Sequence, residues 1–158
     1  MPTGAHTLLT LLVALTAFPS ERSSVSPDHR YRVTWTAPPE AGGLHSLSII
    51  DLRTEAASRL FSFTRHVEVL WSPSGRHLAL TDFRGSNESV VFVFTPSDPS
   101  VAIPVSLPAD IAASVAPHGH RYVRAVRWAS PIVLVLRVTA HDNSVIPPFE
   151  GQFKYIVR

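Results

Sequence analysis

Cysteine is the first thing this chain lacks, since none of its 158 residues is one. Disulfides, thiolate metal sites and cysteine nucleophiles are therefore excluded, and so is a bacterial lipid anchor attached through a cysteine. The sequence also has no G-x-S-x-G elbow and no S-x-x-K motif, two local signatures of serine hydrolases. No phosphate-binding loop is present, because Gly42 and Gly43 are not followed by a helical pattern.

No catalytic residue and no cofactor can thus be assigned from the sequence, which favours a non-enzyme over an enzyme. A catalytic triad assembled only by the fold stays open as an alternative, because triad members need not be close in sequence.

Charge of one sign is scarce too. Lys154 is the only lysine, and 14 basic against 12 acidic residues leave a formal net charge of +2. So small an imbalance indicates no basic surface for nucleic acid, and we expect no nucleic-acid partner. With 45% hydrophobic and 16% charged residues, the composition is typical of one globular domain.

The N-terminus carries one apolar run, LLTLLVALTAF, from Leu8 to Phe18. This run has the length of a secretory h-region and is too short to span a bilayer comfortably. No Lys or Arg precedes it, so an uncleaved anchor and ordinary structure remain alternatives. We interpret residues 1–20 as a secretory signal peptide, which predicts a secreted or periplasmic domain over residues 21–158 and no stable membrane insertion after cleavage.

The stretch VEVLWSPSGRHLALTDFRGSNESVVFVF, residues 67–94, contains three strand signals and two turn signals. Its first strand alternates apolar and other side chains, the two-residue period of a strand. Ser72-Pro73-Ser74-Gly75 has the composition of a tight turn, and Arg84-Gly85-Ser86-Asn87 is a second one. The last strand, residues 90–94, is apolar at every position, which predicts that both of its faces are covered.

The same reading over the rest of the chain predicts an all-β fold of about ten antiparallel strands in a meander. Pro104 marks one of them as an edge strand. Residues 109–115 fit a short helix or a loop equally well. The predicted strands are residues 30–37, 45–52, 59–64, 67–71, 77–83, 90–94, 101–107, 122–128, 132–139 and 152–157.

A tryptophan, then Ser-Pro-x-Gly, a basic residue, an apolar strand, an Arg-Gly-x-Asn turn and a second apolar strand resembles the repeat of TolB-like β-propellers, relatives of the WD repeat. A second copy begins at Ser26 and has His29 at the glycine position, 46 residues before the copy at Ser72. This spacing lies within the roughly 40 to 50 residues of a propeller blade. A third, weaker copy contains Trp128, which holds the place of Trp71.

The resemblance implies two to three propeller blades, fewer than the roughly four or more that close a propeller. The chain should therefore form a partial propeller or a twisted sandwich, or a homo-oligomer that covers the open blade faces.

Candidate sites are few. Asp82, Arg84, Asn87 and Glu88 put charged and polar groups around one hairpin, and we predict a binding rim there, with turn chemistry and solvated charge as the alternative. His118 and His120 are two potential metal ligands without a nearby third, which falls short of a metal site.

The sequence thus predicts an exported, non-catalytic interaction module that presents its loops to a protein partner, as TolB-like propellers do in the bacterial envelope. The alternative is a small hydrolase or carbohydrate-active domain with a site at the blade rim that uses Asp82 or His77.

Overall fold

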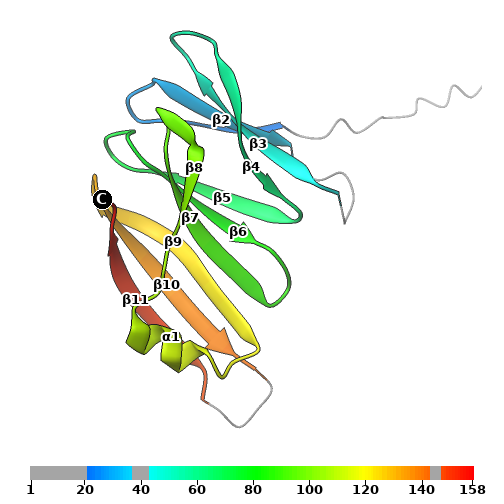
Figure 1. Cartoon of the computed structure of the whole chain (residues 1–158), viewed down its shortest axis with the longest axis vertical. Coiled ribbons are helices and arrows are strands. Elements are labelled where there is room, and N and C mark those ends of the chain that lie inside the picture. Colours follow the sequence, from blue (N-terminus) through cyan, green and yellow to red (C-terminus); the bar gives the residue numbers. More distant parts are fainter. Residues whose placement is uncertain (1–20, 37–42, 143–146) are drawn as a thin grey trace, which may run out of the picture.

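The computed structural model describes residues 21–36, 43–142 and 147–158, and all that follows concerns these residues. They form eleven strands and one short helix, arranged along the long axis of the molecule as three successive units in two sheets, one of four strands and one of seven (Figure 1). The helix is seven residues long, and the described residues contain no helix long and apolar enough to cross a membrane.

The first sheet is an antiparallel meander of four strands in the order β1-β2-β3-β4. Its third and fourth strands are joined by an Asx turn, in which the carboxylate of Asp51 accepts a hydrogen bond from the backbone amide of Arg53 at 2.9 Å. The strands are β1 (Glu21–Val25), β2 (Tyr31–Thr36), β3 (His45–Asp51) and β4 (Ala57–Phe63).

The four strands of the second unit, called the second sheet, repeat the meander, with β8 at one edge paired only to β7. Its strands are β5 (His66–Trp71), β6 (Leu78–Phe83), β7 (Glu88–Thr95) and β8 (Asp98–Pro104). The third unit follows the helix α1 (Ala109–Val115) and comprises β9 (His120–Ser130), β10 (Val133–His141) and β11 (Phe149–Ile156).

The second and third units share one sheet through a short parallel contact between β7 and β9, in which Glu88 and Ser89 lie opposite Arg121 and Tyr122. Parallel pairing is possible here because the long connection through α1 returns the chain in the same direction.

Both faces of the second sheet are buried. Leu78 and Leu80 of β6 pack toward the first sheet, whereas Ala79 between them packs toward the third unit. On β7, Phe94 joins the first core and Val93 joins the second. The prediction that residues 90–94 are covered on both faces is therefore confirmed.

The outer sheets bury only one face each. On β10, Leu134 and Leu136 pack against the second sheet, and Val138 continues the same face onto Val115 of α1. The helix thus covers the part of the third unit that the second sheet does not reach. The opposite face is mainly charged and polar, with Arg137, Glu150, Gln152 and Lys154 exposed. It also carries the exposed Ile156 and the buried Val135, which is paired with Lys154 and Arg127.

The two Ser-Pro turns are built alike. The hydroxyl of Ser26 accepts a hydrogen bond from the backbone amide of Tyr31 at 2.9 Å. The hydroxyl of Ser72 accepts the equivalent bond from the backbone amide of His77 at 3.0 Å. His29 and Gly75 occupy the same place with φ of 55° and 71°. The predicted correspondence of the two copies is therefore confirmed, including a histidine in the left-handed conformation that glycine normally adopts.

The two tryptophans of the repeat also hold equivalent positions. The indole nitrogen of Trp71 donates to the hydroxyl of Ser24 at 3.1 Å, and that of Trp128 donates to the carbonyl of Leu70 at 3.1 Å. Ser24 and Leu70 both lie two residues before a Ser-Pro pair. Each indole therefore reaches back to the first strand of the preceding unit at the same register position.

One detail differs from the sequence-based expectation, and the structure decides two that the sequence left open. Strand β1 was not predicted, so the first unit is complete with four strands rather than incomplete. The segment 109–115, left open between helix and loop, is helical. The three units form an open stack, with no closure into a propeller in the part of the chain that the structure describes. The edge position of β8 agrees with the prediction from Pro104.

We expect Trp71→Phe and Trp128→Phe each to lower the free energy of unfolding by about 1 kcal/mol more than Trp35→Phe does. All three changes shrink a half-buried indole, but in the described structure Trp35 makes no indole hydrogen bond. Urea unfolding of the three variants measures the difference. Equal losses in all three would contradict an equivalent bonding role for Trp71 and Trp128.

Candidate binding site

The predicted hairpin rim lies between β6 and β7. Asp82 is near the end of β6, and its carboxylate accepts a hydrogen bond from Nε of Arg84 at 3.2 Å. The Asp82 side chain is only 7% exposed, and within the described structure its Oδ1 has no hydrogen-bond partner. The guanidinium of Arg84 also lies over the ring of Phe92, 5.5 Å from its centroid.

The electrostatics of the rim centre on this buried carboxylate. Burial raises the pKa of Asp82, because removal from water disfavours the charged form, and the charge of Glu88 raises it further. The hydrogen bond and charge of Arg84 act in the opposite direction. The rim therefore holds a carboxyl group that ionises less readily than usual.

The structure brings only part of the predicted set together. The charges of Arg84 and Glu88 both act on the carboxyl group of Asp82. Asn87 contributes its backbone carbonyl, which accepts a hydrogen bond from the amide of Arg121 at 2.8 Å. Glu88 also starts the parallel contact with β9. This hairpin thus joins two units as well as displaying polar groups, and a binding role for its four residues stays a prediction.

His77 does not belong to the same site. It precedes β6 while Asp82 lies near its other end, which separates them by about 16 Å at the strand rise of roughly 3.3 Å per residue. Its ring stacks on Trp128 with centroids 6.0 Å apart, and burial together with Arg76 lowers its pKa. The two residues named for a hydrolytic site therefore cannot act on one reacting group.

The two predicted metal candidates also separate in their surroundings. His118 is buried just after the C-terminal end of α1, and its amide donates to the carbonyl of Val115 at 3.1 Å. His120 instead stacks on His141 with ring centroids 5.0 Å apart. Among the described residues, no three His, Cys, Asp or Glu side chains are grouped to hold a metal ion.

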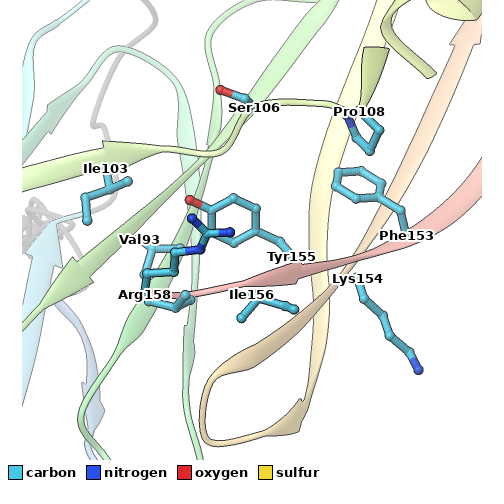
Figure 2. Close-up of a pocket in the computed structure, with 10 residues that line it drawn as sticks. Val93, Ile103, Ser106, Pro108, Phe153, Lys154, Tyr155, Ile156 and Arg158 are labelled. Atoms are coloured by element: carbon cyan, nitrogen blue, oxygen red, sulfur yellow. The ribbon is translucent and has the colours of Figure 1, made fainter. Parts of the chain in front are cut away.

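The sequence reasoning missed a groove of about 500 Å³ between β11 and the segment that follows β8 (Figure 2). Residues 153–158, at the end of β11 and just beyond it, line it on one side. The other lining residues come from β7, β8 and the segment after β8: Val93, Ile103, Ser106 and Pro108. A volume in the range of roughly 300 to 1,000 Å³ is typical of ligand sites.

The groove exposes apolar side chains beside basic ones. Ile156 is 59% exposed and Ile103 is 37% exposed, although isoleucine is among the residue types most often found fully buried. Lys154 and Arg158 also line the groove, and neither forms an ion pair in the described structure. In Figure 2, Lys154 points away from its neighbours Phe153 and Tyr155, as the alternation of a strand requires. The site is therefore apolar with a positive border.

The sequence indicates two of the segments that line this groove, but not that they lie together. Pro104 indicates an edge strand, and the last predicted strand, residues 152–157, is one of its walls. Nothing in the local pattern indicates that these two segments, about 50 residues apart, face one another.

Comparison with solved structures finds β-propeller proteins that are similar to this chain. The β-propeller domain of the Trilobed protease from Pyrococcus furiosus, described as having an open velcro topology, matches with a TM-score of 0.56 and 16% identity over 87% of this chain and 40% of that one. TolB from Acinetobacter baumannii matches with a TM-score of 0.51 and 14% identity over 87% of this chain and 32% of that one.

A structure from a study of two prolyl endopeptidases matches with a TM-score of 0.51 and 12% identity over 83% of this chain and 21% of that one. No protein-family model and no curated protein matches the chain. The chain spans less than half the length of each of these three structures. The likeness therefore shows the fold, and the chain has the propeller-like, TolB-like architecture that its repeats predict.

The burial of Asp82 has a measurable consequence for stability. Because the folded chain holds the proton more tightly than the unfolded chain, whose carboxyl has a pKa near 3.8, raising the pH above this value lowers the free energy of unfolding until the folded group has ionised. Asp82→Asn removes this titration. We expect the stability of the variant relative to the native chain to rise between pH 3 and pH 7.

Asp51→Asn is the matched control, because the pKa of Asp51 is lowered by the backbone amide of Arg53 and the shift has the opposite sign. Its stability relative to the native chain should fall over the same pH range. Urea unfolding at a series of pH values measures both. Parallel pH profiles for the two variants would show that Asp82 is not held in a desolvated site.

Proposed function

We propose that this chain is an exported, non-catalytic binding module that presents loops and a sheet-edge groove to a protein partner. The observation that carries the proposal is the groove between β11 and the segment after β8, with exposed Ile103 and Ile156. Exposed apolar side chains gathered at one hollow are typical of surfaces that bind proteins.

Two further observations support a binding role over a catalytic one. His77 and Asp82 lie at opposite ends of β6, so these two residues cannot act together as an acid and a base. The groove is lined by apolar, basic and hydroxyl side chains, without a carboxylate or an imidazole, the groups that enzymes use most often for proton transfer.

A rim hydrolase remains the second candidate because of Asp82. A buried carboxyl group with a raised pKa and a free oxygen is the kind of group that serves as a general acid. Screening of the purified protein against hydrolase and glycosidase substrates tests it. An activity that disappears in Asp82→Asn while the variant stays folded would favour this candidate over the binding module.

Export rests on the N-terminal apolar run from Leu8 to Phe18 and is compatible with the likeness to TolB from Acinetobacter baumannii. We expect the mature protein to begin near Glu21 and to be found outside the cytoplasm. Mass spectrometry of the protein from separated cell fractions determines both. Intact residues 1–20 on a cytoplasmic product would contradict export.

The binding role is tested by a photo-crosslinking amino acid placed at Ile103, with Val126 as the matched control. Both are apolar strand residues of similar exposure, 37% and 42%, but Val126 does not line the groove. We expect one protein to be crosslinked in living cells from Ile103 and not from Val126. Equal products at both positions, or none at Ile103, would refute a groove-directed partner.

A further inference from the structure

The third unit has one strand fewer than the other two. The first two units each have four antiparallel strands, ending in β4 and β8. Trp71 and Trp128 show that β5 and β9 are equivalent first strands. Counting from them, β11 corresponds to β7 and β3, and the described residues supply no strand for the fourth place beside β11.

The backbone of β11 has a defined free edge. The amide of Val157 donates to the carbonyl of Ile132 on the β10 side at 2.9 Å. The register between β10 and β11 has no shift, and backbone groups of successive residues in a strand point to opposite sides. The amides and carbonyls of Lys154 and Ile156 therefore point away from β10, toward the free edge.

The groove follows this edge. Its lining includes six consecutive residues, 153–158, although side chains of a strand alternate between faces. A hollow can touch every residue in turn only along the backbone edge. The five steps between these six residues, at a rise of roughly 3.3 Å, span about 17 Å, the length of an ordinary strand.

The chemistry of the edge indicates what fits beside it. Ile156 and Ile103 offer apolar contacts to alternate side chains of an added strand. Lys154 and Arg158 are unpaired in the described structure, and no acidic side chain lines the groove. A segment that carries a carboxylate would therefore be complementary in charge.

We propose that the free edge of β11 binds an extended segment of the partner protein as the fourth strand of the third unit. The segment has apolar residues at alternate positions and an Asp, Glu or terminal carboxylate near Arg158. Hydrogen bonds between the backbone of the bound segment and the backbone of Lys154 and Ile156 provide the affinity, whatever the sequence of the segment. Contacts of its side chains with Ile103 and Ile156 provide the specificity. This inference rests on the binding role proposed above and specifies how the partner is held.

A proline scan along the edge tests the proposal. Ile156→Pro removes an amide that faces the groove, whereas the bonds from β11 to β10 remain, because that amide points away from β10. Gln152→Pro is the matched control, since its amide points to the same edge but lies outside the groove lining. Ile156→Ala keeps the amide and removes the side chain only. Far-UV circular dichroism checks that each variant is folded.

The probe is a library of random twelve-residue peptides displayed on phage and selected against the full chain. We expect selected peptides to alternate apolar residues and to carry an acid. They should bind Gln152→Pro as tightly as the native chain and Ile156→Pro about tenfold more weakly, the loss that one or two backbone hydrogen bonds would cause. Arg158→Glu should weaken the acidic peptides and favour basic ones.

Amide hydrogen exchange gives a result that needs no proline variant. The amides of Lys154 and Ile156 should exchange fast in the free protein and become protected when a selected peptide binds, whereas that of Tyr155 is protected throughout. Protection of Lys154 and Ile156 in the free protein would show that the edge is already occupied, by this chain or by a second copy, and would overturn the proposal. Failure to select any peptide would do the same.

The outcomes separate this inference from the proposed function. A partner crosslinked from Ile103 that binds Ile156→Pro as well as the native chain would leave the binding role intact and refute strand addition. Peptides that require the Ile156 amide, combined with no crosslinked partner in cells, would support strand addition and refute the proposed function.

Discussion

Burial of both faces of the second sheet is the constraint on which the rest of the structure depends. Alternate side chains of β6 and β7 enter two different cores, so the first sheet and the third unit can each be stable while burying only one face. Removing either neighbour would expose a largely apolar face of the second sheet. The stacking of the three units therefore buries most of the apolar surface of the second sheet.

Local patterns were sufficient to predict most strands, since the alternation of apolar and polar residues and the Ser-Pro turns can both be recognised within a few consecutive residues. The position of Trp71 and Trp128 could be predicted as well, because both precede the same kind of turn. Strand β1 could not, because its sequence, ERSSV, has little apolar alternation and is held mainly by pairing with β2. The parallel contact of β7 with β9 is equally invisible in sequence, as it depends on the long connection through α1.

The candidate sites show the same division. Asp82 lies two residues beyond Leu80, on the face that packs toward the first sheet, so its burial follows from the alternation of β6. Its closeness to Arg84 is also local. The groove, in contrast, is formed by β11 and by residues that follow β8, and each has ordinary strand or loop composition. Only the stacking of the sheets brings them together, which is why sequence reasoning pointed to the hairpin and missed the groove.

The open stack has unpaired strand edges at β8 and β11, and the two edges at the groove are protected differently. β8 carries Pro99 and Pro104, which cannot donate to an added strand. β11 has no proline over its eight residues and keeps its outward amides, with the charges of Glu150 and Lys154 on one face as its main defence against uncontrolled pairing. Proline blocks any neighbour, whereas charge discriminates between neighbours. The edge of β11 is thus the one at which an added strand could be admitted selectively.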